Sequence, residues 1–203
     1  MKAFVLDGND RCLDFLNTEM FEGDQRIELL EDFTDLVDWL KVSGLVDSGT
    51  GKELLNDKKI NKEKILKHVK SFRSKLKKMV KELSLGELPG EPGIKAINQI
   101  LKSNKAYPQV HMHNGKVELM AIPITQYNDP LRLIAESAVE LLTQKDLALV
   151  KKCNDPVCTL FFYDESKNHT RRWCSMDRCG NRAKASIHYR RKKEKLLLQP
   201  MYE

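Results

Sequence analysis

The stretch CNDPVC at residues 153–158, followed 15 residues later by CSMDRC at residues 174–179, decides the fold of the last quarter of this chain. It places four cysteines in two pairs of equal spacing, Cys153, Cys158, Cys174 and Cys179. Two short-spaced pairs with a linker of this length are typical of tetrahedral zinc sites, because each pair grips the ion from a tight turn. Four thiolates leave no open coordination position, so the pattern predicts one structural zinc ion.

The residues around the cysteines predict a hairpin followed by a helix. Residues 159–163 indicate a strand, 164–168 a turn and 170–173 the returning strand. Ser175 is placed to cap a helix that starts inside the second pair. This order of turn, hairpin and ligands at a helix start is that of a treble-clef finger. Such a unit is too small to bury a core of its own, so zinc would supply on the order of 10 kcal/mol of its folding free energy.

The composition favours a cytoplasmic protein. The 203 residues contain no run of 18 apolar residues, which argues against a membrane span. The first residues reach Asp7 too soon for a signal peptide, so we expect a reducing compartment in which cysteines serve as metal ligands. The fifth cysteine, Cys12, lies among apolar neighbours and is predicted to be buried.

The net charge of +6 is unevenly distributed along the chain. It is −9 over residues 1–57, +10 over 58–81, −2 over 82–150 and +7 over 151–203. Basic blocks attract polyanions, of which nucleic acid is the commonest. The block at 58–81 has a simpler interpretation, because its charge would neutralise the acidic segment before it.

Upstream of the cysteines the sequence predicts a mainly helical domain. Residues 11–18 indicate a strand or short buried segment, and Asn114-Gly115 indicates the turn of a hairpin at 110–120. Apolar periodicity predicts helices at 31–41, 61–83 and 94–101 and another after Asp129-Pro130, with Asn61 as the N-cap of the longest. We therefore expect an α+β chain, with a helical domain at 1–150, a zinc finger at 151–203, and separate cores for the two.

Two motifs carry a family resemblance. RRWCSM at 171–176 with CGNRAK at 179–184 resembles the CGNR zinc-finger family, and FYD at 162–164 with Ser166 and Asn168 resembles its hairpin. LDFLNT at 13–18 resembles the signature of the ABATE domain that usually precedes this finger. The resemblance implies an ABATE-like regulatory domain and a CGNR finger with a basic C-terminal helix. Proteins of this kind are described as stress-induced transcription regulators or as zinc-ribbon-like RNA-binding proteins.

The basic side chains of the finger are candidate nucleic-acid contacts: Arg171, Arg172, Arg182, Lys184, Arg190, Arg191, Lys192 and Lys193. For Arg182 a second role stays open, namely bracing the thiolates. We expect a transcriptional regulator that binds DNA rather than RNA, although no helix-turn-helix pattern is evident, which keeps an RNA-binding protein open. A zinc-braced protein-interaction adaptor is the alternative from another class. A homodimer and an effector of residues 1–150 also stay open.

An enzyme ranks last among these classes. The sequence offers no nucleophile–base pair, no glycine-rich phosphate loop and no acidic metal cluster. We therefore expect a binding protein without catalytic activity.

Overall fold

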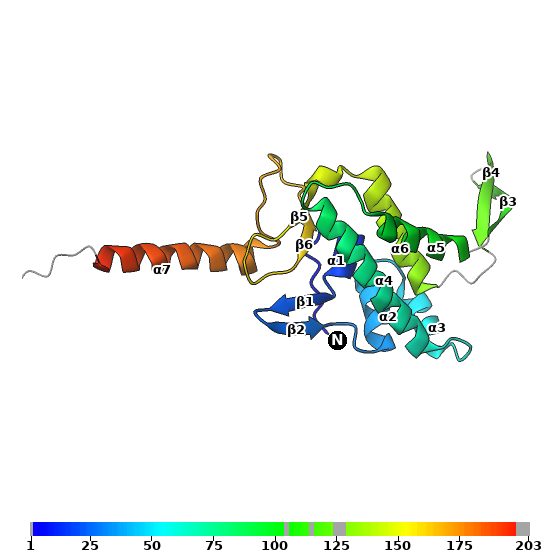
Figure 1. Ribbon diagram of the computed structural model, residues 1–203. Coiled ribbons are helices and arrows are strands. Elements are labelled where there is room, and N and C mark those ends of the chain that lie inside the picture. Colours follow the sequence, from blue (N-terminus) through cyan, green and yellow to red (C-terminus); the bar gives the residue numbers. More distant parts are fainter. Residues whose placement is uncertain (1, 104–105, 114–115, 124–128, 198–203) are drawn as a thin grey trace, which may run out of the picture.

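The computed structural model describes residues 2–103, 106–113, 116–123 and 129–197, and its elements are labelled in Figure 1. The helices are α1 (Arg11–Leu16), α2 (Phe33–Val42), α3 (Ser48–Asn56), α4 (Lys62–Leu83), α5 (Glu91–Ser103), α6 (Pro130–Gln144) and α7 (Asn181–Leu197). The strands are β1 (Glu19–Glu22), β2 (Gln25–Glu28), β3 (Ala106–His113), β4 (Lys116–Pro123), β5 (Val150–Lys152) and β6 (Phe161–Tyr163). Three antiparallel pairs, β1–β2, β3–β4 and β5–β6, join the described strands. The predicted α+β class is confirmed.

The long helix α4 supports the body of the molecule. Asn61 accepts a hydrogen bond from the Lys64 N–H at its start, as predicted. Its apolar stripe packs against α1, α2, α5 and α6 in one core, and the buried members of the stripe are Val69, Phe72, Leu76, Met79, Val80 and Leu83. The predicted helix at 31–41 corresponds to α2, whose capping box joins Asp32 and Asp35 and whose Trp39 is fully buried.

The segment 11–18 forms a helix instead of the strand we considered. Asp10 caps α1 by accepting a hydrogen bond from the Leu13 N–H. Every residue from Cys12 to Leu16 is buried, because α6, β6 and α4 all pack against this helix. A helix that is covered on all sides shows no 3.6-residue period, so the sequence pattern could not distinguish it from a strand.

The remaining elements follow the sequence closely. The predicted helix at 94–101 lies inside α5, which begins earlier, at Glu91. Asp129 caps α6 and Pro130 occupies its first turn, as predicted. Strands β3 and β4 form the predicted hairpin, whose Asn114-Gly115 turn lies outside the described residues. None of the helices in the described ranges has the length and hydrophobicity needed to cross a bilayer.

The finger is paired differently from the predicted hairpin. Strand β6 pairs with β5, which lies before the first cysteine, and residues 170–173 form no strand. Two other contacts occupy the backbone there: the Arg171 N–H donates to Asp164 Oδ2 at 3.0 Å, and the Arg172 carbonyl accepts from the Asn154 N–H at 2.9 Å. After a π-helical turn at Met176–Gly180, α7 extends away from the body (Figure 1).

The expectation of separate cores is wrong. Phe161 of the finger is buried in the large core of the helical body, together with Val150. A second, smaller cluster contains the four cysteines, Leu160 and Phe162, and Met20 from β1 belongs to it. The two parts of the chain therefore exchange buried side chains across their boundary.

Candidate metal centre

The four predicted cysteines converge in the second cluster. Their sulfur atoms all lie within 4.8 Å of one another, and all four residues are buried. The sulfur–sulfur distance is 3.8 Å between Cys158 and Cys174 and 3.6 Å between Cys174 and Cys179. A Zn–S bond of about 2.3 Å in a tetrahedron requires sulfurs about 3.8 Å apart. The donor set and its spacing fit one zinc ion, which would hold the two halves of the finger together.

Tight turns position both cysteine pairs. The Cys153 N–H donates to the Leu160 carbonyl at 2.9 Å and the Cys158 N–H to the Asp155 carbonyl at 3.0 Å. In the second pair the Gly180 N–H reaches the Ser175 carbonyl at 2.9 Å, which closes the π-helical turn. A Cβ atom on Gly180 would lie 2.7 Å from Met176 Sδ, so glycine leaves room for the methionine that packs there.

Without a metal the crowded thiols compete for protons. Hydrogen bonds from Cys158 and Cys174 lower the pKa of Cys153 well below its usual range. The same bonds raise the pKa of Cys174 and raise that of Cys158 to about 12. Zinc binds thiolates, so loading the site must release the protons that Cys158 and Cys174 hold.

Arg182 braces the metal site from outside the sulfur cluster. Its Nη2 donates to Cys179 Sγ at 3.4 Å, and its Nε donates to Asp155 Oδ2 at 2.7 Å. These two contacts raise the pKa of Arg182 above its usual value. The guanidinium therefore offsets thiolate charge and ties the helix after the second pair to the turn inside the first. Asn181 makes a weaker contact, 3.4 Å from its Nδ2 to the Asp177 carbonyl.

Comparison with known families agrees with this geometry. A family model described as "CGNR zinc finger" matches residues 150–192. The ABATE model, described as "Putative stress-induced transcription regulator", matches residues 9–145. The chain belongs to the ABATE family. It carries a CGNR finger after its ABATE domain, the arrangement that the two motifs implied. No curated protein matches the sequence.

The ABATE signature at 13–18 connects the ABATE domain to the CGNR finger. The Asn17 side chain donates from Nδ2 to the Phe161 carbonyl at 2.9 Å and accepts from the Phe161 N–H at 3.0 Å. Thr18 Oγ1 accepts from Arg73, which is 1% exposed and also donates to Glu28 Oε1 at 2.9 Å. Sequence reasoning treated this signature as a domain marker and missed its contacts, although polar residues inside an apolar run signal buried partners.

A second connection runs through the residues before α1. Asp14 Oδ1 accepts from the Gly8 N–H at 2.8 Å, and the Gly8 carbonyl accepts from the Tyr163 N–H at 2.7 Å. Burial raises the pKa of Asp14 to about 7, although the Gly8 N–H opposes this shift. Asp7 adds two contacts with the finger, through its carbonyl to Arg171 Nη2 at 3.0 Å and through its carboxylate to Arg178.

The candidate nucleic-acid contacts fall into two groups. Arg171 lies inside the finger, where it stacks on Phe162 and donates to backbone carbonyls, and Arg182 holds the metal site. Arg172 is exposed with its guanidinium carbon 5.2 Å from the centroid of the Trp173 ring. The other candidates are exposed on α7, namely Lys184, Arg190, Arg191, Lys192 and Lys193.

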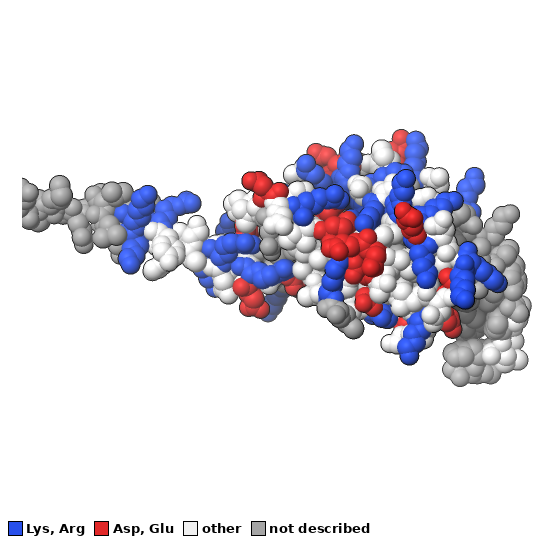
Figure 2. Space-filling model, turned by 90° about the horizontal axis from the view of Figure 1, so that it is seen from below, with Lys and Arg blue, Asp and Glu red and all other residues white. Residues whose placement is uncertain are grey.

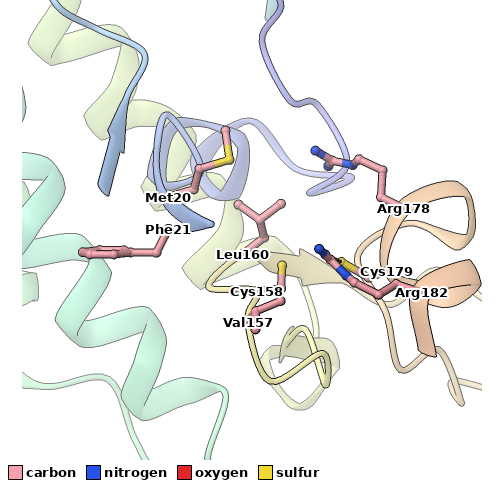
Figure 3. Close-up of a pocket in the computed structure, with 8 residues that line it drawn as sticks. All are labelled: Met20, Phe21, Val157, Cys158, Leu160, Arg178, Cys179 and Arg182. Carbon is pink, nitrogen blue, oxygen red and sulfur yellow. Dashed lines mark hydrogen bonds between the residues drawn. The ribbon is translucent and has the colours of Figure 1, made fainter. Parts of the chain in front are cut away.

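A hollow of about 310 Å³ lies beside the cysteine cluster. Figure 3 shows the residues that line it. Met20 and Phe21 of β1 line it from one side, and Arg178 and Arg182 line it from the other. Both arginines already pair with carboxylates, Asp7 and Asp155. The hollow therefore marks the seam between the β1–β2 hairpin and the finger, and its cations are already neutralised.

Proposed function

We propose that this protein is a cytoplasmic, zinc-containing regulator that binds nucleic acid, with DNA as the preferred target, and that α7 makes the principal contacts. The observation that carries the proposal is the setting of α7. It begins two residues after Cys179, the last of the four cysteines, and extends away from the body (Figure 1). Its side chains from Asn181 to Lys193 are all exposed except that of Ala183, and among the described elements it packs mainly against the preceding turn.

The charge of α7 suits a polyanion. None of its described basic side chains beyond Arg182 forms an ion pair within the described part of the chain. Successive helical residues point about 100° apart, so the cations of the run 190–193 surround the helix. This spread favours phosphate contacts over the reading of bases by one face. A 17-residue helix is about 25 Å long and narrow enough for the DNA major groove.

Two further observations support a binding role. Figure 2 shows α7 carrying Lys and Arg side chains, whereas the body has acidic side chains clustered among its basic ones on the same face. An isolated helix of this length is only marginally stable in water, so a partner along α7 would stabilise it. The description of the ABATE family supports a regulatory role. The proposed role is binding rather than catalysis, because four thiolates would leave a bound zinc ion no open position and the sequence offers no nucleophile–base pair.

The salt dependence of binding tests the proposal. Each phosphate neutralised on duplex DNA contributes about −0.9 to the slope of log affinity against log salt. Replacing Arg190, Arg191, Lys192 and Lys193 by glutamine should flatten this slope by about two units or more while the zinc content stays constant. Selection from DNA and RNA pools at physiological salt would identify the target. If RNA is selected more strongly than DNA, RNA is the target. If neither binds at about 50 mM salt, the protein is better explained as a protein-interaction adaptor.

A further inference from the structure

We infer that a second basic surface, a groove between the C-terminal end of α4 and the CGNR finger, binds the phosphate backbone of the same nucleic acid that α7 contacts. This inference rests on the proposed function. The groove has a volume of about 490 Å³, and α4 and β5 lie side by side where it forms (Figure 1). Its lining includes the side chains of Lys81, Ser84, Lys152, Asn154, Thr170 and Arg172. We call it the α4–finger groove.

The charged residues that line the groove are all cationic. The lining includes five cationic side chains and no carboxylate. Two of the five are engaged internally: Lys151 donates to Asp164 Oδ2 at 2.5 Å, and Arg171 donates to the Trp173 carbonyl at 3.0 Å. The three others are exposed and form no ion pair within the described residues, and these are Lys81, Lys152 and Arg172.

The carboxylate that pairs with Lys151 does not oppose this charge. Asp164 is fully buried beneath the groove, and Lys151 neutralises it. Burial disfavours its charged form, but hydrogen bonds from Lys151, Ser166 and the Arg171 N–H outweigh burial and lower its pKa. The carboxylate therefore remains paired inside the finger and does not neutralise the exposed cations of the groove.

The end of α4 also presents no strong acceptor to an incoming anion. The Val80 carbonyl accepts from the Ser84 N–H at 2.9 Å, and the Lys81 carbonyl accepts from Ser84 Oγ at 2.8 Å. The carbonyls of Glu82 and Leu83 accept from the N–H groups of Leu85 and Gly86. These contacts satisfy the carbonyls that usually make a helix C-terminus repel anions.

The position of the groove favours nucleic acid as its occupant. Cys153 lines the groove and Cys179 lies in the π-helical turn that directly precedes α7, and their sulfurs lie within 4.8 Å of each other. A zinc ion bound by both cysteines would therefore join the groove to the base of α7. A nucleic-acid strand carries regularly spaced charges that reach both surfaces, and phosphates accept from lysine, arginine, threonine and asparagine alike.

Only one end of the lysine-rich helix takes part. Among its cations Arg73 and Lys77 pair with Glu28 and Glu19 of the first hairpin, which agrees with the neutralising role considered for this block. Lys58, Lys64 and Lys67 lie at or before the opposite end of α4, are exposed, and form no ion pair with described residues. They provide a control with the same loss of charge at a distance from the groove.

Three full-length variants test the groove: Lys81→Gln/Lys152→Gln/Arg172→Gln, the control Lys58→Gln/Lys64→Gln/Lys67→Gln, and the α7 variant described above. Their binding to a duplex DNA oligonucleotide, or to RNA if selection prefers it, is measured as a function of salt. The groove variant should flatten the salt slope by about two units and weaken binding at least about tenfold at 50 mM salt. The control should change the slope by less than one unit. Unchanged zinc content and melting temperature would show that the variants fold.

Chemical footprinting gives a second readout in the unaltered protein. Bound oligonucleotide should protect Lys81 and Lys152 from acetylation and leave Lys64 and Lys67 reactive. If the groove and control variants lose affinity equally and Lys81 stays reactive, the groove does not contact nucleic acid. The proposed function would still stand in that case, provided that wild-type binding depends on α7. If the wild type binds no nucleic acid, both proposals fail. Poly-glutamate serves as a model of an acidic protein. If it binds the wild type as tightly as nucleic acid does and the groove variant loses affinity for both equally, the occupant is an acidic protein and the inference is overturned.

Discussion

The ABATE domain and the CGNR finger differ in what holds them together. In the described part of the chain the large core has 25 buried residues, and nearly all of them come from the ABATE helices. The cluster of the finger has seven, of which four are the cysteines. Apolar burial contributes about 2 kcal/mol for each large side chain, so the ABATE domain folds on hydrophobic burial and the finger cannot. The finger depends on zinc and on the polar contacts around it.

The seam between them mixes both kinds of interaction. The ABATE domain buries Phe161 of the finger and binds its backbone through Asn17, and the finger encloses Met20 in return. The finger is therefore a metal-folded unit whose strand pair β5–β6 is docked on a hydrophobic body. Its stability should therefore be linked to that of the body, and the linkage is measurable.

The largest effect is expected from loss of the metal. Cys174→Ser should abolish zinc binding and unfold residues 153–197, because the metal contributes on the order of 10 kcal/mol to a site of this kind. The ABATE helices should persist, but they should lose about 2 kcal/mol of stability as the burial of Phe161 weakens. Elemental analysis, thermal unfolding followed by circular dichroism and limited proteolysis measure the three effects. An unchanged melting temperature for the helices would show that the docking contributes nothing.

A smaller effect is expected at the seam itself. Asn17→Ala leaves the buried N–H and C=O groups of Phe161 without partners, which should cost about 2 kcal/mol. The same substitution in a Cys174→Ser background should cost much less, because the finger is then already undocked. Urea denaturation of the four proteins completes the double-mutant cycle. Equal costs in both backgrounds would mean that Asn17 acts only within the ABATE domain.

Local patterns predicted the metal ligands and the long helices. The spacing of the four cysteines sufficed for the zinc site, and the apolar stripe and Asn61 sufficed for α4. These features are encoded by residues close together in the sequence, so spacing and periodicity carry them.

What the sequence could not show depends on distant pairing. Asn17 and Phe161 are 144 positions apart, and no local pattern reveals that one binds the other. Strand β6 pairs with β5 across the first cysteine turn because Arg171 and Asp164 occupy the backbone that we expected to return as a strand. The segment at 11–18 lost its helical period because it is covered on every side. In each case tertiary contacts decided the outcome.

The smallest expected effect concerns the carboxyl group of Asp14, which secures the loop that bonds to Tyr163. Its pKa is about 7 in the folded protein, because burial disfavours the charge, and about 3.9 in an unfolded chain. Between these values the folded state keeps a proton that the unfolded state has lost, so this group lowers stability as pH rises from about 4 to 7. The slope is at most about 1.4 kcal/mol per pH unit. Asp14→Asn retains an oxygen acceptor for the Gly8 N–H and removes the titration.

The free energy of unfolding of the wild type relative to Asp14→Asn should therefore fall between pH 5 and 7 and level off above pH 8. Urea denaturation at matched zinc content, checked at each pH, measures this difference and cancels the pH dependence of metal binding. Because Asp14 acts through Gly8 on Tyr163, the fall should shrink in a Cys174→Ser background, where the finger no longer holds that loop in place. A difference that is flat with pH would show that Asp14 is solvated and ionised in the folded protein, and would remove it from the seam between the two regions.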